Sequence, residues 1–429
     1  MHDQMPPSDT AESVTAGHPD KLCDAISDAI LDECLLIDSS ARVAVETMVK
    51  GIEGEAVIIL AGEVSINGQA PDYERIARDK ASSIGYTDST IGMDARSSEL
   101  CKVLVYITTQ SQFISQGVDG DLETQGAGDQ GVMFGYACTE TEQTAELRGR
   151  YFPLAAALSQ RLTRRLEQVH EEKILPWIRP DGKSQVTVQI EKNTENPPRI
   201  STIVIASQHA PDAGPNWPDS NNLTEVERRM YIDGEIRKHI IEHAIPESLL
   251  NEPEIIVNGT GSFPDPGGPY ADAGLTGRKI IVDTYGGGRH GGGAFSGKDP
   301  SKVDRSAAYY ARWAAKHIVA SGIAEKCEIQ VAYAIGKASP VGLRVNTFGT
   351  SKAGLGNDPD RKISNLLLKY FDWRPAAMIR DLKLKRPIYS ATSSGGHFGR
   401  VPTDEGLFPW EKLDSEKLDA LAGELGNQE

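Results

Sequence analysis

Short runs of alternating apolar and polar residues recur along the whole chain, and each is long enough for one β-strand with one covered face. The runs predicted as strands span residues 42–50, 55–65, 102–110, 184–191, 199–208, 254–258, 278–284, 328–336 and 343–348. Stretches with apolar residues at helical spacing, many opening on a proline, lie between the runs. They predict helices over 19–36, 71–84, 153–171, 224–242, 300–321 and 362–370.

The order of these elements distinguishes between two fold classes. Pairs of neighbouring strands are followed by single helices, whereas a parallel α/β sheet would need strands and helices in strict alternation. A chain of 429 residues is also long enough for two or three domains, each with its own apolar core. The sequence therefore predicts an α+β protein with several domains.

The charge of the chain limits the partners that are expected, and its cysteines limit the metal sites and disulfides. The formal net charge is −16, which argues against nucleic acid or an acidic membrane as the main partner. The five cysteines form no CxxC pair, so neither a zinc site nor a disulfide framework is predicted. The first residues lack the basic and apolar regions of a signal peptide, and no run approaches about 18 apolar residues. A cytoplasmic protein is expected.

The glycine-rich segment 284–305 is a local exception to this acidic character. Glycines at 286–288 and 291–293 allow a ligand to approach the backbone, and Asp299 followed by Pro300 predicts a helix start. Free amide groups at such a helix end, with Lys298 and Lys302 nearby, are suited to phosphate. The segment predicts a polyphosphate site.

A P-loop is one alternative for this segment. Residues 292–298 satisfy G-x-x-x-x-G-K, and the run before the glycines is predicted as a strand. The next residue, however, is Asp299, where the motif needs the Ser or Thr hydroxyl that holds magnesium. A P-loop kinase or ATPase is therefore the weaker interpretation.

The second chemical segment begins a helix at Pro19. His18, Asp20 and Lys21 are predicted at its exposed end, where an acid and a base beside a histidine favour a catalytic role. Asp20, Asp24 and Asp28 recur at a spacing of four residues and so share one helix face. Asp24 and Asp28 are predicted to be a solvated acidic surface, and Asp20, beside the phosphate site, a magnesium ligand.

Several long motifs, in order from residue 12 to 414, resemble the S-adenosylmethionine synthetase (methionine adenosyltransferase) family. They include Glu12-Ser-Val-Thr-Ala-Gly-His-Pro-Asp-Lys, the stretch 126–137, the stretch 175–187, the stretch 274–286 and 291–307, with Gly396-His-Phe-Gly-Arg near the end. The resemblance implies three similar interleaved α+β domains, with mixed or antiparallel sheets and helices on one face. The expected boundaries are 1–16 with 140–264, 17–119 with 265–306, and 120–139 with 307–429.

The resemblance also implies the reaction. The methionine sulfur attacks C5′ of ATP and expels the triphosphate, which is then hydrolysed to phosphate and diphosphate. Such a reaction depends on alignment and on stabilising the leaving-group charge more than on a general base. Two Mg²⁺ and one K⁺ are expected, together with a homodimer or homotetramer whose active sites are shared between subunits.

Matching positions carry the family's roles to this chain. The implied catalytic residues are His18, Lys183, Arg278 and Lys298. The same four residues are expected at ATP, with Asp181, Ser262, Phe263, Asp272, Lys279 and Ala294. Methionine contacts are expected from Glu63, Gln110, Asp129, Asp272 and Lys302, and residues 110–120 correspond to a gating loop. Asp20 and Asp304 are the implied Mg²⁺ ligands and Glu46 the K⁺ ligand.

A non-catalytic regulatory subunit of the same family is the alternative from a different class. Such a subunit is expected to lose catalytic residues. This chain retains His18, Asp20, Lys183, Lys298, Lys302 and Asp304. The sequence therefore favours an active enzyme.

Overall fold

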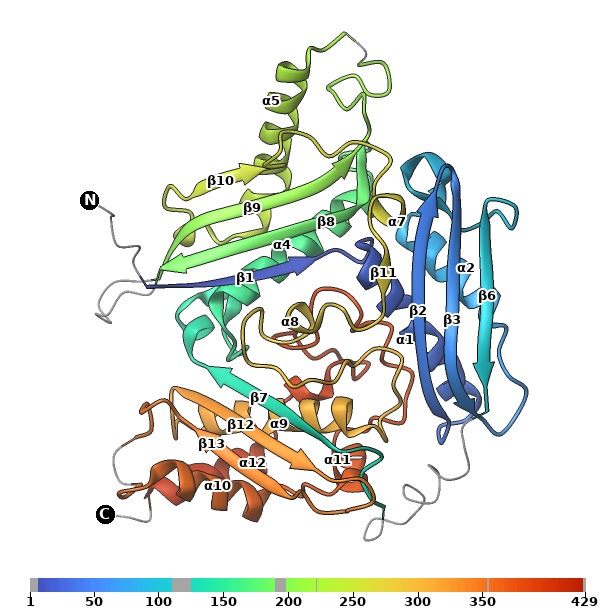
Figure 1. Ribbon diagram of the computed structural model, residues 1–429. Helices are drawn as coiled ribbons and strands as arrows, with labels where there is room; N and C mark the ends of the chain where they lie inside the picture. The colour runs from blue at the N-terminus through green and yellow to red at the C-terminus, as the bar shows by residue number, and fades with distance from the viewer. Residues whose placement is uncertain (1–6, 110–124, 190–197, 221, 353–354, 427–429) are drawn as a thin grey trace.

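The computed structural model describes residues 7–109, 125–189, 198–220, 222–352 and 355–426. Three larger sheets surround a central region of loops and short helices (Figure 1). Each sheet combines strands from separate stretches of the chain, and helices pack on the sheets, which confirms the predicted α+β class. The domain boundaries by residue number stay a prediction.

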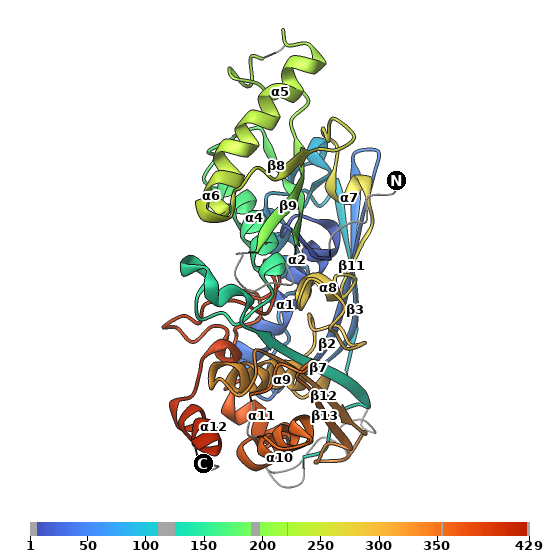
Figure 2. The same cartoon turned by 90° about the vertical axis from the view of Figure 1, so that its left-hand side faces the viewer.

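The first sheet has the order β1-β8-β9-β10, and its first three strands run antiparallel. Its strands are β1 (Ser8–Val14), β8 (Ile178–Gln189), β9 (Arg199–His209) and β10 (Glu254–Val257). Helix α4 (Leu154–Glu171) packs on β1 and β8 through its apolar stripe, while α5 (Glu225–Ile236) extends to the far end of the molecule (Figure 2). The start of β8 lies beside the residues that follow β1, where the hydroxyl of Thr15 donates to the carbonyl of Pro180 at 2.6 Å.

The second sheet, in the order β11-β2-β3-β6, is covered by helices on one face only. Its strands are β2 (Arg42–Ile52), β3 (Glu55–Ser65), β6 (Cys101–Thr108) and the short β11 (Gly274–Leu275). Helix α1 (Pro19–Ile37) packs on β2 and β11, and α2 (Tyr73–Ile84) packs on α1 and β6. Among the described residues, no element covers the other face of this sheet (Figure 2).

The third sheet, in the order β13-β12-β7, carries the remaining long helices. Its strands are β7 (Gly131–Cys138), β12 (Lys326–Tyr333) and β13 (Gly342–Asn346). Helix α9 (Val303–Ala320) packs on β7 and β12 and is buried along almost its whole length. Around it lie α10 (Pro359–Tyr370), α11 (Pro375–Asp381) and α12 (Ser415–Gly426).

The remaining elements are short and lie mostly in connections. They are β4 (Thr87–Asp88), β5 (Met93–Asp94), α6 (Glu242–Ala244), α7 (Gly268–Ala271) and α8 (Ile280–Asp283). Single turns of 3-10 or π helix cover Ser89–Ile91, Glu140–Gln143, Ala145–Leu147, Arg237–Ile241, Glu247–Leu249 and Pro409–Glu411. Across the described part of the chain, no helix combines the length and apolar character needed to cross a membrane.

One predicted strand is wrong. Residues 278–284 contain the short helix α8, in which the amide of Asp283 donates to the carbonyl of Lys279 at 2.9 Å. Ile281 is 40% exposed whereas Val282 and Asp283 are buried, so the burial does not alternate as in a strand. A short apolar run cannot be assigned from periodicity alone, and here the buried position of Asp283 fixes a helical turn.

Candidate active site

His18 caps the first turn of helix α1, and Pro19 follows it at the first helical position. The Nδ1 atom of His18 accepts a 3.2 Å hydrogen bond from the amide of Asp20. Burial, reinforced by the charge of Lys279, lowers the pKa of His18 to about 4. The imidazole is therefore neutral at neutral pH, and because Nδ1 accepts, Nε2 carries the proton and can donate to an oxygen.

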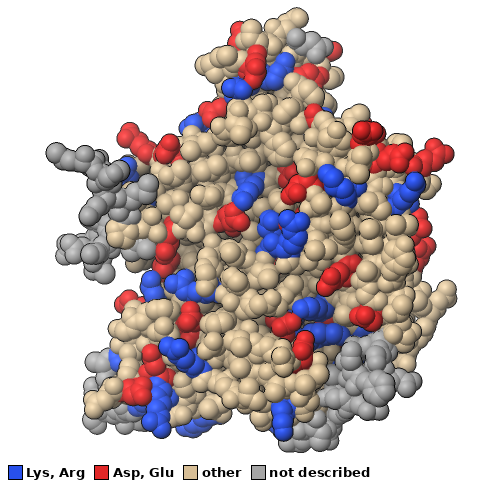
Figure 3. All heavy atoms as spheres, in the orientation of Figure 1, with Lys and Arg blue, Asp and Glu red and all other residues tan. Residues whose placement is uncertain are grey.

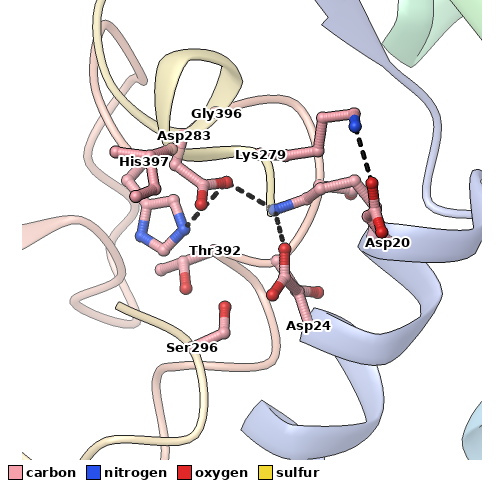
Figure 4. Close-up of polar contacts among 12 residues, drawn as sticks. Asp20, Asp24, Lys279, Asp283, Ser296, Thr392, Gly396 and His397 are labelled. Carbon is pink, nitrogen blue, oxygen red and sulfur yellow. Dashed lines mark hydrogen bonds and ion pairs between the residues drawn. The ribbon is translucent and has the colours of Figure 1, made fainter. Parts of the chain in front are cut away.

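The Asp20 carboxylate, which is completely buried, gathers donors from the segment that follows β11. It accepts from the amide of Leu275 at 3.0 Å and from Lys279 Nζ at 2.6 Å, as Figure 4 shows for the lysine. Arg278 Nε lies 3.5 Å from the same carboxylate. The structure thus brings together His18, Asp20, Arg278 and Lys279, as the sequence predicted, although Asp20 is not at an exposed helix end.

Lys183 and Asp181, on β8, face the same helix start from the first sheet. Lys183 Nζ lies 2.5 Å from Glu12 on β1, and its charge helps to lower the pKa of His18, whereas Asp272 raises it. Burial raises the pKa of Asp181 to about 7, against the opposing hydrogen bond from the amide of Gly268. Two sheets therefore contribute ionisable groups to one centre.

A second pair of charges lies at the end of the glycine-rich segment. Lys298 Nζ donates to Asp304 at 2.8 Å, and Asp304 stands in the first turn of α9. A side chain at Gly293 would bring its Cβ within 2.1 Å of the Asp304 carboxyl carbon. Glycine at this position therefore lets the backbone lie directly against Asp304.

The sequence predicted that Asp299 begins a helix, and this prediction is wrong. Asp299 is buried, accepts from the amides of Val43 at 2.8 Å and Ser301 at 2.9 Å, and also pairs with Lys302. Helix α9 begins only at Val303, and a helix precedes the glycines where a P-loop needs a strand. Because Asp299 ties the turn to β2, the P-loop interpretation is wrong.

Asp24 and Asp28 were predicted to be a solvated surface, and that prediction is also wrong. Both are completely buried, as is Lys21. Lys21 Nζ lies 3.0 Å from Asp24 and 2.5 Å from Asp283, and Arg305 donates twice to Asp28, at 2.7 and 2.9 Å. The lysine and the arginine supply the charge that buried carboxylates require.

The remaining predicted residues are spread over three places. Ser262 and Phe263 lie against His209 at the end of β9, where the Phe263 amide donates to the imidazole at 3.1 Å. Ala294 packs opposite Gly277, whose added Cβ would lie 2.5 Å away. Among the described residues, no hydrogen bond or ion pair joins Phe263 or Ala294 to Asp20 or Asp304.

Four of the residues expected at methionine and potassium, Glu46, Glu63, Asp129 and Asp272, are exposed, whereas Lys302 is half-buried. Glu46 on β2 and Glu63 on β3 point from the open face of the second sheet, and Asp129 accepts from the amide of Gln130 at 2.7 Å. Gln110 and the expected gating loop lie outside the described residues. The space-filling view shows basic and acidic side chains side by side near the middle of the surface (Figure 3).

The carboxylates fit one kind of metal site. Within the described residues, no three His, Cys, Asp or Glu side chains come together as a metal cage. Asp20 and Asp304 are single carboxylates, each beside a cation suited to phosphate. Magnesium is commonly held by one or two carboxylates together with substrate phosphates and water, and this donor set fits that arrangement.

The sequence did not predict the buried ion pairs of Lys21 with Asp283 and of Arg305 with Asp28. It also did not predict the position of His397, whose Nε2 lies 3.6 Å from Asp283 and has no hydrogen-bond partner among the described residues. Asp28 and Arg305 are 277 positions apart, so no local pattern joins them. The only signal was the spacing of the aspartates in α1, which a solvated helix face would show equally.

The chain matches three family models in succession. They describe the N-terminal domain (residues 8–112), the central domain (residues 124–263) and the C-terminal domain (residues 266–412) of S-adenosylmethionine synthetase. The S-adenosylmethionine synthase of Corynebacterium glutamicum is 48% identical over 97% of this chain and 97% of that protein. The enzyme of the same name from Nocardia farcinica is 49% identical over 96% of this chain and 98% of that protein, and that of Sorangium cellulosum is 50% identical over 94% and 87%.

Proposed function

The chain belongs to the S-adenosylmethionine synthetase family and makes S-adenosylmethionine from ATP, L-methionine and water, and on this premise we propose the residues that act. The activity is methionine adenosyltransferase, and the fold has the three α+β domains of the family. The observation that carries the assignment is the convergence of Arg278 and Lys279 on Asp20, beside the neutral His18.

The triphosphate occupies the space between this group and Lys298. A lone pair on the methionine sulfur forms the bond to C5′, and the C5′–O electron pair leaves with the triphosphate. Lys183, Arg278, Lys279 and Lys298 stabilise the oxygens that gain charge, and His18 donates from Nε2 to one of them. Water then cleaves the bound triphosphate to phosphate and diphosphate.

The metal ions are assigned to three carboxylates. Asp20 and Asp304 would each hold one Mg²⁺, and Glu46 the K⁺. When bound, magnesium neutralises charge on the phosphate oxygens. The single carboxylates with nearby cations support this assignment.

The substrate pockets complete the assignment. Phe263 packs on adenine, and Asp181, Ser262, Asp272 and Ala294 line the nucleotide site. Glu63, Gln110, Asp129, Asp272 and Lys302 contact methionine. The placement of Lys302 next to Asp299, two residues before Asp304, supports a methionine site adjacent to the phosphates.

A homodimer, alone or paired into a homotetramer, shares its active sites between subunits. The open face of the second sheet supports this proposal, because the register places Leu275, Met48, Ile59 and Leu104 in one row across four strands. Met48 is 41% exposed and Leu104 39%. Glu46 lies in the next outward-facing row and Glu63 in the row after it, so a second copy stacked here would bring its own groups near the proposed ion and methionine residues.

The net charge of −16 supports a cytoplasmic enzyme that acts on small molecules, without nucleic acid or membrane. The test is incubation with ATP, methionine, Mg²⁺ and K⁺, with each component omitted in turn, followed by mass detection of the sulfonium product. Formation of the product only with all four, with phosphate and diphosphate, is expected. ADP formed without methionine would contradict the proposed site.

A further inference from the structure

Helix α1 carries four aspartates at a spacing of four residues, and each accepts a backbone amide from a distant loop. We call Asp20, Asp24, Asp28 and Asp32 the α1 aspartate row. Their amide donors are Leu275 at 3.0 Å, Gly277 at 2.8 Å, Gly297 at 2.9 Å, and the pair Tyr389 at 2.9 Å and Ser390 at 2.7 Å. One rigid helix therefore fixes three loops relative to one another.

The two middle aspartates hold loops of the same design. Gly277 and Gly297 both have left-handed backbone, with φ of 80° and 78°. Each directly precedes a proposed phosphate-binding residue, Arg278 in one loop and Lys298 in the other. A side chain at Gly297 would place its Cβ 1.9 Å from the carbonyl oxygen of Val45, so the conformation of this loop is tightly determined.

Both oxygens of each carboxylate in the middle pair are engaged by groups of the protein itself. Asp24 uses one oxygen for the Gly277 amide and the other for Lys21 Nζ. Asp28 uses one for the Gly297 amide and Arg305, and the other for Arg305 and the Ser296 hydroxyl at 3.1 Å. Both are fully shielded from solvent, so any effect on the reaction passes through the loops.

We propose that Asp24 and Asp28 are positioning residues for the triphosphate. By holding the amide of Gly277, Asp24 fixes the loop that carries Arg278 and Lys279, and by holding the amide of Gly297, Asp28 fixes the loop that carries Lys298. The inference rests on the proposed function, which assigns these three cations to phosphate. Misplacement of a binding group by about 1 Å can cost about a hundredfold in rate.

Replacement of either aspartate by asparagine removes this function with little change of shape. The asparagine of Asp24→Asn has one carbonyl oxygen where Asp24 has two, although both of its partners are donors. Its NH₂ group, itself a donor, must therefore face either the Gly277 amide or Lys21. Asp28→Asn has the same effect between Gly297 and Arg305. Asp32→Asn is the matched control, because Asp32 also engages both of its oxygens, with the amides of Tyr389 and Ser390, but in a loop without phosphate-binding residues.

The informative measurements are hydrolysis of inorganic tripolyphosphate and the separate KM values for ATP and methionine in the full reaction. For Asp24→Asn and Asp28→Asn we expect kcat/KM for tripolyphosphate to fall by about a hundredfold. The KM for ATP should rise while the KM for methionine stays within about twofold. Asp32→Asn should lower the melting temperature but leave both KM values unchanged.

A purely structural role predicts a different outcome. All three variants would then lose stability, and the folded fraction of each would show wild-type KM values, which would overturn the inference. If Asp24→Asn does not fold, Asp24→Glu keeps the charge opposite Lys21 but displaces the acceptor by one methylene, and the same rise in KM for ATP is expected. Lys298→Ala separates the positioning role of Asp24 and Asp28 from the assignment of the cations to phosphate. If Lys298→Ala also leaves tripolyphosphate hydrolysis intact, the assignment of Lys298 to phosphate fails.

Discussion

Lys279 donates a 2.6 Å hydrogen bond to Asp20, so a residue proposed to bind phosphate is paired with a residue proposed to bind magnesium. The same relationship recurs at 2.8 Å between Lys298 and Asp304. When magnesium triphosphate enters, each lysine can exchange its carboxylate for a phosphate oxygen while the carboxylate takes the metal. Both ion pairs are thus replaced without leaving an unpaired charge.

This exchange predicts that Mg²⁺ and the triphosphate bind interdependently. Either ligand alone must break an ion pair and leave one partner without compensation, whereas both together do not. We expect Mg²⁺ to tighten tripolyphosphate binding by about 5- to 150-fold, and tripolyphosphate to tighten Mg²⁺ binding by the same factor. Calorimetric titrations in both orders, corrected for the metal affinity of free tripolyphosphate, measure this coupling. Additive binding would contradict the exchange.

Lys298→Ala should damage the chemical step more than the fold. The variant loses a charge-assisted contact to the leaving group, which is typically worth about 3–4 kcal/mol. Turnover should therefore fall by two to three orders of magnitude, estimated roughly from that energy. The KM for methionine should change little, and the thermal melt should remain near that of the wild type. Wild-type turnover in steady-state assays would exclude Lys298 from the mechanism.

The outcome for α1 shows what a single sequence can and cannot predict. The start of the helix at Pro19 follows from a local signal and is confirmed, while the roles suggested for His18 and Asp20 stay proposals. The burial of Asp24 and Asp28 could not be predicted, because a row of acids at helical spacing looks the same whether it faces water or a buried arginine. Their partners, Gly277 and Arg305, lie 253 and 277 positions away along the chain.

The region around the glycine loop shows a second limit. The glycines and cations of 284–305 predict a polyphosphate site, and that site stays a prediction. The secondary structure predicted on either side of the glycines was wrong. Asp283 resembles the end of a strand but pairs with Lys21, and Asp299 resembles a helix cap but accepts from the amide of Val43. Tertiary contacts of these two buried acids override the local preference.

The stability of the protein should depend on the charge of His317. Its Nδ1 bonds the carbonyl of Trp313 at 2.8 Å, and its Nε2 accepts from the amide of Asp414, just before α12, at 2.8 Å. Burial lowers the pKa of His317 to about 4, against the raising effect of the Trp313 carbonyl. The folded protein therefore resists protonation, which requires the loss of the Asp414 bond.

Between about pH 6.5 and pH 4 the unfolded chain binds the proton and the folded chain does not, so stability falls as the pH falls through this window. The contribution of His317 has a limiting slope of about 1.4 kcal/mol per pH unit and is absent above the window. His317→Leu should be less stable than the wild type at pH 7 but should lose less on acidification. Parallel urea titrations across this range would show equal pH dependence if His317 plays no part.

The open face of the second sheet should control assembly. Met48→Asp introduces a charge into the apolar row, where like surfaces are proposed to meet, and burial of an unpaired carboxylate is unfavourable. We expect dissociation to monomers in light-scattering measurements, with activity lost in proportion. Met230→Asp on α5 is the control, since Met230 is even more exposed, at 71%, and α5 lies away from the second sheet (Figure 1). Equal loss of assembly in both variants would exclude a specific interface.

Asp20 and Asp304 offer the sharpest test of the metals and of the shared site together. An acid in the first turn of a helix ordinarily stabilises that helix by about 0.3–1 kcal/mol, and with only that role Asp20→Asn and Asp304→Asn would leave the Mg²⁺ dependence of activity unchanged. If they bind magnesium, each variant should need much more Mg²⁺, with far less effect on the thermal melt.

The two variants should then be unfolded, mixed and refolded, with mixed dimers verified by differential tagging. If the two acids of one site come from different subunits, a mixed dimer contains one site with both acids intact and one with neither, so partial recovery is expected. If both acids of a site come from one chain, every site in the mixed dimer lacks one acid, and activity stays at the level of the single variants.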